Sequence, residues 1–190
     1  MKRFAIRFNS PVVLSFAILS LLVLVLDSVT GGASTARLFC VYRAPLTDPL
    51  TYVRFFTHVL GHSGYSHYMG NMLLLLLVGP GLEEKYGSRN LLLTIVITAF
   101  ATGLVQFLLF PHSALLGASG VVFMMIVLSS FTEMKKGGIP LTMLLVVALY
   151  LGSEIADGPT ESDNVSHLTH IVGGVSGIVF GLRLARAKKR

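Results

Sequence analysis

The sequence predicts an all-α membrane protein with six transmembrane helices and a long outer loop between the first and second spans. Hydrophobic residues make up 53% of the 190 residues and charged residues only 13%, whereas a soluble domain carries about 25% charged residues. The apolar residues also gather into separate blocks rather than being spread along the chain. These blocks cover roughly residues 11–26, 68–82, 91–111, 113–132, 139–152 and 168–182.

Each block is interpreted as one span of a single domain that covers residues 1–190. Several blocks are shorter than the ~20 residues that cross a bilayer core, but polar flanking residues can extend a helix where they face protein or a wet cavity. The first block follows a basic start and precedes "ASTA". A cleaved signal peptide therefore remains an alternative to a retained first span.

The basic residues predict the orientation of the spans. Twelve of the 15 Lys and Arg residues lie before the first block, between blocks two and three, between blocks four and five, or after block six. Because Lys and Arg concentrate in cytoplasmic segments, we expect a multi-pass membrane protein with both termini in the cytoplasm. The net charge of +6 is interpreted as this topology signal, and no nucleic-acid partner is expected.

The two segments predicted on the outer side differ in composition. Residues 27–66 are too apolar and aromatic for a solvated loop, so short helices at the membrane interface are expected there. Residues 153–166 are acidic and contain Gly and Pro, which favours a mobile cover over the outer end of the bundle. The single Cys40 excludes an internal disulfide.

Four polar side chains stand out because polar residues inside membrane spans are costly and usually functional. His67 and Asn71 begin the second span, Ser119 lies near the start of the fourth, and His170 lies near the start of the sixth. These three spans are predicted to run in the same direction. At a rise of 1.5 Å per residue, all four side chains are therefore expected about 10 Å below the outer surface.

Glycines predict that the fourth and sixth spans approach closely. Gly173, Gly174, Gly177 and Gly181 follow His170 on one helical face, and Gly117 and Gly120 flank Ser119. Small residues let membrane helices approach backbone to backbone. Such an approach would bring the Ser119 hydroxyl to the His170 imidazole, and a Ser–His pair is an activated nucleophile.

Hydrogen-bond donors for a developing oxyanion are also predicted near Ser119. His67 and Asn71 are four residues apart and project from one helical face. The backbone N–H groups of Ala118 and Ser119 are expected to be unpaired at a helix N-terminus. Simple helix packing remains the alternative interpretation of the "GASG" segment.

A metal site is the alternative reading of His58, His62 and His67. No "HExxH" motif occurs, and no carboxylate or Cys lies among these histidines, so neither a metal nor another cofactor is expected. His62 is expected to orient the loop or His67 by hydrogen bonding. His58 is expected to have a structural partner.

The chain resembles the rhomboid intramembrane serine proteases over about residues 52–186. The resemblance rests on "HSGYSHYMGN", "GASG" and "HIVGGVSG", with weaker support from "YVRFFTH" and "LEEKYGS". It implies that Ser119 is the nucleophile and His170 the general base, without metal or nucleotide. It also implies oxyanion stabilisation by His67, Asn71 and the Ser119 amide, and cleavage of membrane-spanning substrates near the outer face.

The sequence departs from the family pattern at two positions. Val53-Arg54 replaces a frequent Trp-Arg pair, and Phe123 replaces a frequent Tyr. Phe123 is expected to stack beneath His170 without donating a hydrogen bond. The resulting prediction is a serine endopeptidase acting on single-span or other transmembrane proteins, with membrane lipid around it. A non-catalytic membrane chaperone or binding protein of the same fold and, less favoured, a small transporter are the alternatives.

Overall fold

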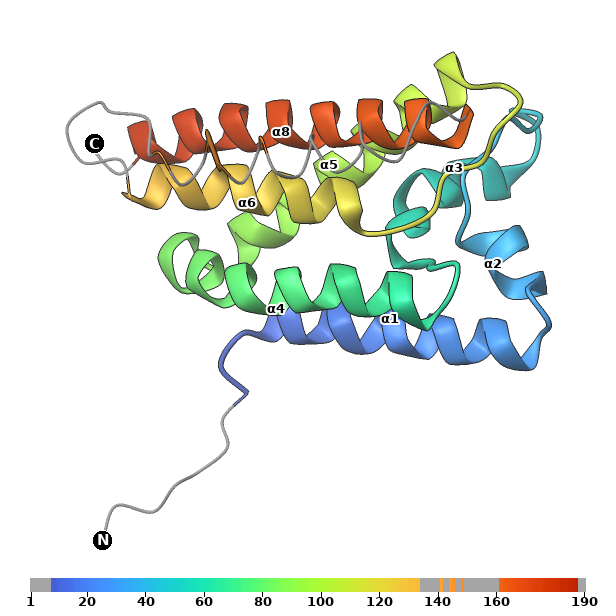
Figure 1. Ribbon diagram of the computed structural model, residues 1–190, viewed down its shortest axis with the longest axis horizontal. Helices are drawn as coiled ribbons and strands as arrows, with labels where there is room; N and C mark the ends of the chain where they lie inside the picture. The colour runs from blue at the N-terminus through green and yellow to red at the C-terminus, as the bar shows by residue number, and fades with distance from the viewer. Residues whose placement is uncertain (1–7, 134–140, 142–143, 146–147, 149–160, 188–190) are drawn as a thin grey trace, which may run out of the picture.

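The computed structural model describes residues 8–133, 141, 144–145, 148 and 161–187, and describes the side chains of residues 8–131, 141, 144–145, 148 and 168–184. Most of the fifth predicted block, residues 139–152, lies outside these ranges. In chain order the helices are α1 (Pro11–Val29), α2 (Ala33–Leu38), α3 (Pro49–Thr57), the 3₁₀ helix η1 (His58–Leu60), α4 (Tyr65–Tyr86), α5 (Ser88–Leu109), α6 (Ser119–Glu133) and α8 (Glu161–Ala187) (Figure 1).

The long helices form a bundle in which α4, α6 and α8 begin at the same end (Figure 1). Helices α1 and α5 run in the opposite direction, and the short helices α2 and α3 gather where α4, α6 and α8 begin. The N-terminal ends of α4, α6 and α8 therefore share one layer of the bundle.

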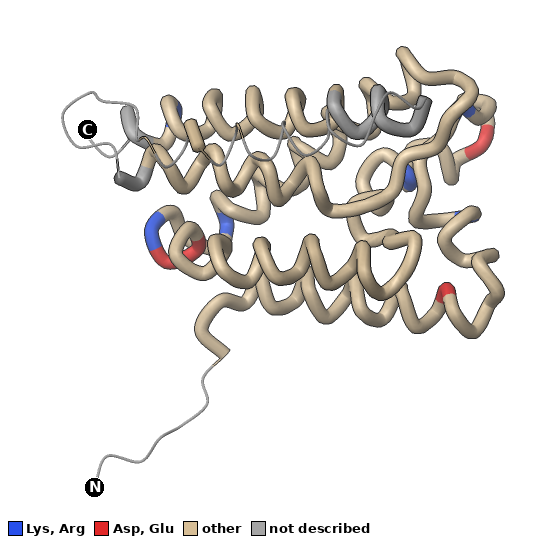
Figure 2. The backbone as a smooth tube through the Cα atoms, in the orientation of Figure 1, with Lys and Arg blue, Asp and Glu red and all other residues tan. Residues whose placement is uncertain are grey.

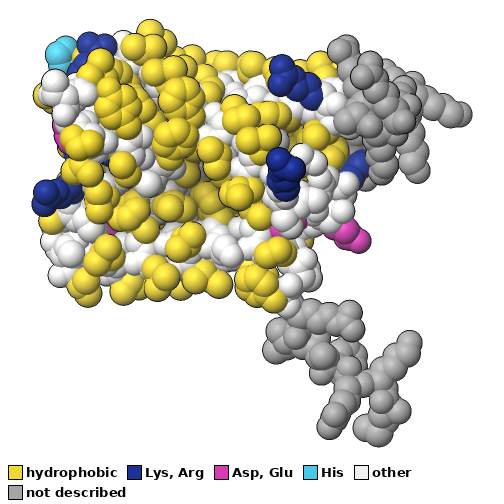
Figure 3. Space-filling view, turned by 180° about the vertical axis from the view of Figure 1, so that it is seen from behind, with side chains coloured by type: hydrophobic (Ala, Val, Ile, Leu, Met, Phe, Trp, Pro, Cys, Tyr) yellow, Lys and Arg dark blue, Asp and Glu magenta, His cyan; other side chains and the backbone are white. Residues whose placement is uncertain are grey.

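The described residues are those of an all-helical membrane protein. Two helices, α1 and α5, are both long and apolar enough to cross a membrane, and the shorter apolar helices Ser119–Phe131 and Leu168–Leu184 lie within α6 and α8. Lys, Arg, Asp and Glu of the described part occur toward the two ends of the bundle (Figure 2). An apolar surface covers much of the face between them (Figure 3). The count of six spans stays a prediction.

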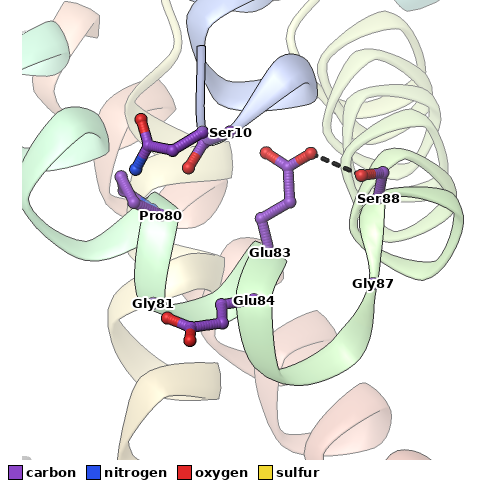
Figure 4. A pocket seen from close by; sticks show the side chains of 8 residues that line it. Ser10, Pro80, Gly81, Glu83, Glu84, Gly87 and Ser88 are labelled. Atoms are coloured by element: carbon purple, nitrogen blue, oxygen red, sulfur yellow. Dashed lines mark hydrogen bonds between the residues drawn. The ribbon is translucent and has the colours of Figure 1, made fainter. Parts of the chain in front are cut away.

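The carboxylate of Glu83 connects three helices at the end of the bundle where α1 begins. Glu83 is only 4% exposed, and its Oε1 and Oε2 accept hydrogen bonds from the backbone N–H groups of Val12 (3.0 Å) and Val13 (3.1 Å). The Ser88 hydroxyl at the start of α5 donates a third bond of 2.7 Å (Figure 4). Because Pro11 opens α1 without an N–H of its own, Glu83 serves the next two donors of that helix end.

Helices α6 and α8 make a close backbone contact along the glycines of α8. A Cβ added to Gly173 would overlap the carbonyl oxygen of Gly120, and one added to Gly177 would lie 2.7 Å from the carbonyl oxygen of Met124. At Gly174 it would lie 3.0 Å from Cε1 of Phe123. Any side chain at these positions would push the two helices apart, so glycine is what permits this spacing.

The structure sets two boundaries more sharply than the apolar pattern does. The fourth apolar block begins at residue 113, whereas α6 begins at Ser119, where a helix N-terminus was expected. Leu115 instead pairs with Val41 through two backbone hydrogen bonds of 2.9 Å, and Gly117 has a φ of +123°, which an α-helix cannot contain. The predicted outer cover, residues 153–166, also ends early because α8 already begins at Glu161.

Candidate active site

Ser119 is the first residue of α6 and lies half-buried beside a fixed loop. The carbonyl of the fully buried Ala118 accepts the first helical hydrogen bond from Val122, at 2.9 Å. The Gly117 N–H, just before it, donates to the carbonyl of His58 in η1, also at 2.9 Å. The N–H groups at such a helix start lack intrahelical acceptors and carry the positive end of the helix dipole.

His67 presents an N–H group toward this loop. Its Nδ1 accepts the backbone N–H of Ser63 (3.4 Å) and lies 3.1 Å from the Ser63 hydroxyl. An Nδ1 that accepts an N–H carries no proton, so neutral His67 is assigned its proton on Nε2. A Cβ added to Gly117 would lie 2.8 Å from this Nε2. The donor therefore faces the backbone that leads into Ser119.

Asn71 lies one turn further along the same face of α4 and is 6% exposed. Its amide nitrogen donates to the carbonyl of His67 at 3.0 Å. That bond uses one of the two amide hydrogens and fixes the side chain against its own helix. Asn71 thus contacts His67, and it is His67 that contacts the loop before Ser119.

His170 is buried in α8, at 3% exposure, and lies beside the start of α6. Its imidazole centroid is 5.8 Å from the ring of Phe123, with the planes tilted at 47°. The expected stacking beneath His170 is therefore a tilted contact. One residue before His170, Cγ2 of Thr169 lies 3.0 Å from where a Gly120 Cβ would be, so the residues next to Ser119 and His170 touch directly.

The Ser119 hydroxyl makes no hydrogen bond among the residues with described side chains. Catalytic hydrogen bonds are often long in a free enzyme and shorten when substrate binds. The contact between Gly120, Thr169 and Gly173 fixes the backbones on both sides. The Ser119 hydroxyl can therefore change position by rotation about the Cα–Cβ bond while both backbones stay in place.

Sequence reasoning missed three residues that support this arrangement. Ser63 sets the tautomer of His67, Thr169 contacts Gly120, and the methyl group of Thr102 on α5 lies 3.1 Å from the Gly120 Cβ position. Ser63 lies four residues before His67, and this spacing could have indicated the hydrogen bond between them. Nothing local in the sequence marks Thr102, which precedes Gly120 by 18 residues.

His58 and His62, which formed the alternative metal site together with His67, each make their own hydrogen bonds. His58 donates from Nδ1 to the carbonyl of Arg54 (3.1 Å), and its Nε2 lies 3.2 Å from the Thr102 hydroxyl. His62 donates from Nδ1 to the carbonyl of Leu60 (3.1 Å) and meets the ring of His67 edge-on at 5.0 Å. His62 therefore orients the loop by hydrogen bonding and contacts His67 through its ring.

Burial makes both of these histidines hard to protonate. Loss of solvation lowers the pKa of His58 from 6.5 to about 4 and is also the largest cause that lowers the pKa of His62 to about 4. Both residues lie in the segment between α1 and α4, and each is only 1% exposed. They are therefore neutral at pH 7 and keep the hydrogen bonds described above.

We expect the unfolding temperature to fall as the pH is lowered from about 6.5 to 4. The unfolded chain takes up protons on these histidines near pH 6.5, whereas the folded chain does so only near pH 4. Stability is therefore full above pH 6.5 and decreases below it. His62→Gln should flatten the curve measured by thermal unfolding, while His112→Gln, at an exposed position, should not. A wild-type curve that is flat from pH 7 to 4.5 would contradict this account.

Comparison with known proteins places these features in a family. The Rhomboid domain model matches residues 49–187. The chain is 32% identical over 137 residues to Rhomboid-related protein 1 of Caenorhabditis elegans, covering 67% of this chain and 38% of that protein. It is 29% identical over 157 residues to Rhomboid-related protein 2 of Mus musculus, covering 72% of this chain and 52% of that protein.

A bacterial relative is matched over more of the chain. The chain is 27% identical over 167 residues to Rhomboid protease GluP of Bacillus subtilis (strain 168), covering 84% of this chain and 32% of that protein. The chain thus spans between about one third and one half of the length of these relatives. Because the domain match takes in α3 to α8, and with them Ser119 and His170, the chain belongs to the rhomboid family of integral membrane proteins.

Proposed function

We propose that the chain is an intramembrane serine endopeptidase with Ser119 as nucleophile and His170 as general base. The observation that carries the proposal is the backbone contact between Gly120 and Gly173. It holds the residue after Ser119 against the helical turn that follows His170. A base must come within about 2.6–3.2 Å of the hydroxyl that it deprotonates, and this contact makes such an approach sterically accessible.

In the first chemical step, Ser119 Oγ attacks the carbonyl carbon of the scissile peptide bond while His170 takes the hydroxyl proton. The tetrahedral intermediate then breaks its C–N bond, and His170 returns the proton to the leaving amine. A water molecule, deprotonated by the same imidazole, releases the acyl group from Ser119. The proposed reaction requires no metal ion or nucleotide.

The oxyanion of the intermediate is stabilised by donors that are already oriented. The Nε2–H of His67 faces the loop before Ser119, and the N–H groups of Ala118 and Ser119 at the α6 start have no intrahelical acceptor. Asn71 supports His67 from the next turn of α4 and has a second amide hydrogen to donate. Preorganised donors of this kind act on charge that develops in the transition state.

The proposed substrates are single-span or other transmembrane proteins, which meet the enzyme within the bilayer. The charge distribution supports cytoplasmic termini in an inner (plasma) membrane, so the end where α4, α6 and α8 begin is proposed to be the outer one. Cleavage would then occur near the outer face. The relative from Bacillus subtilis is named a protease, which supports the same type of reaction here.

A fluorophosphonate probe tests the proposal on the purified full chain. The probe should label Ser119, located by peptide mapping, and labelling should disappear in Ser119→Ala and in His170→Ala. Ser129→Ala is the matched control, because this serine lies on the same helix and donates to the Ile126 carbonyl at 2.7 Å. Well-folded protein that is neither labelled nor able to cleave transmembrane substrates would favour a non-catalytic binding protein of the same fold.

His67→Ala and Asn71→Ala should lower kcat far more than they raise KM. A donor that acts mainly in the transition state changes turnover rather than substrate binding, and loss of one such donor typically costs about 100- to 1,000-fold in rate. His67→Ala should have the larger effect, because His67 is the residue that contacts Gly117. Steady-state kinetics on a single-span substrate measures the split. A raised KM with unchanged kcat would assign these residues to substrate docking instead.

A further inference from the structure

A polar pocket of about 440 Å³ lies far from Ser119, where α1 begins, α4 ends and α5 begins (Figure 4). Asn9 and Ser10 line it on one side, Glu83 and Glu84 on another, and Gly81 and Gly87 are also part of its wall. A Cβ added at either glycine would meet nothing within 4 Å. The volume is more than ten times the roughly 30 Å³ that one water occupies in the liquid, so the pocket has room for a polyatomic group.

Among the described residues, the pocket is lined by two carboxylates and by no Lys or Arg. Glu83 already accepts three hydrogen bonds, and the N-terminal dipole of α1 offsets its charge. Glu84 is exposed and forms no ion pair among the residues with described side chains. A metal ion would have to displace the donors that hold Glu83, whereas a cation with N–H groups can bind Glu84 and leave them in place.

Ser10 supplies the second observation. It is only 2% exposed, and its hydroxyl makes no hydrogen bond to any residue with a described side chain, although it occupies the N-cap position of α1. Figure 4 shows its side chain turned toward the space between Pro80 and Glu83. The hydroxyl therefore faces the pocket without a protein partner among these residues, and a bound group in the pocket would complete its hydrogen bonding.

The position of the pocket indicates that the cation belongs to a lipid headgroup. Helix α1 has 19 residues and is therefore about 28 Å long, close to the ~30 Å of a bilayer core. Its first residue then lies at the depth of the lipid headgroups. Arg89, which is exposed, follows Ser88 of the pocket wall directly. An acidic pocket next to an arginine complements a headgroup that carries an ammonium and a phosphate group.

We propose that this pocket binds the primary ammonium group of an aminophospholipid headgroup, as in phosphatidylethanolamine. The ammonium carries three N–H donors, and the pocket wall offers acceptors on the Glu84 carboxylate, the Ser10 hydroxyl and the Asn9 side-chain carbonyl. The phosphate then lies on the Arg89 side. The site is separate from the proposed catalytic residues, which lie at the opposite end of α4 and α6.

Native mass spectrometry of the full chain in detergent, with phosphatidylethanolamine, phosphatidylcholine and phosphatidylglycerol of identical acyl chains in competition, tests the proposal. Phosphatidylethanolamine should bind about tenfold more tightly than either competitor, because only its headgroup can donate a charge-assisted hydrogen bond to Glu84. Phosphatidylcholine is the most informative control, because its quaternary ammonium keeps the charge but has no N–H to donate. Phosphatidylglycerol keeps the phosphate and lacks the ammonium.

Two variants locate the site, and a third is the matched control. Glu84→Gln should bring the three lipids near parity, and Ser10→Ala should weaken the preference several-fold. Ser28→Ala, at the far end of α1 where the hydroxyl donates to the Leu24 carbonyl, should keep it. Equal binding of the three lipids, or a preference that survives Glu84→Gln, would overturn the proposal. Displacement by free ethanolamine at the same concentration would assign the pocket to a small amine and overturn the lipid assignment.

Discussion

Ser119→Ala is expected to lower kcat/KM for a transmembrane substrate by at least about 10⁴-fold, while the unfolding temperature stays within a degree or two of wild type. Loss of the nucleophile from a serine–histidine pair removes most of the catalytic effect, and donors and binding alone leave little. The stability should hold because Ser119 is only half-buried and its hydroxyl makes no hydrogen bond among the residues with described side chains. Cleavage assays and thermal unfolding on the same preparation measure both quantities.

His170→Ala in the same assay separates catalysis from packing. His170 is buried against Phe123, so this variant should lose activity to the same extent and also some stability. Because the two residues act as one unit, Ser119→Ala/His170→Ala should be no less active than either single variant. Substantial cleavage by purified Ser119→Ala would refute the serine mechanism.

Gly173→Ala is expected to destabilise the protein by about 3 kcal/mol, and Gly173→Val by more. The added Cβ would overlap the carbonyl oxygen of Gly120, and a backbone atom cannot move aside as the end of a flexible side chain can. Overpacking a well-packed contact costs roughly 1–3 kcal/mol, and more where the neighbour is rigid. Equilibrium unfolding in detergent measures the change.

Gly70→Ala is the matched control for this contact. Gly70 lies within α4, and a Cβ there would meet nothing within 4 Å, so the change should be neutral or stabilising by up to about 1 kcal/mol through helix propensity. Gly173→Ala should also lose activity below its unfolding temperature, because separating α8 from α6 moves His170 away from Ser119. Wild-type stability and activity in Gly173→Ala would show that the close contact is unnecessary.

Much of the site follows from patterns that are local in the chain. The direction of each helix follows from where the Lys and Arg residues lie, and counting from the helix ends then puts His67, Ser119 and His170 in one layer. The glycines at fixed intervals after His170 mark the face of α8 that lies against α6. These are one-dimensional features, since membrane topology and helical periodicity convert residue spacing directly into depth and direction.

The remaining features depend on contacts between residues far apart in the chain. The apolar run begins at residue 113 and does not reveal what starts the helix at Ser119. That start is set by the positive φ of Gly117 and by the His58 carbonyl that accepts the Gly117 N–H. In the sequence Glu83 lies in a polar turn, but in the structure it caps α1, whose Val13 precedes it by 70 residues. The sequence predicted which side chains share a depth. Tertiary structure decided their hydrogen-bonding partners, because a partner is selected by which backbone the fold brings within about 3 Å.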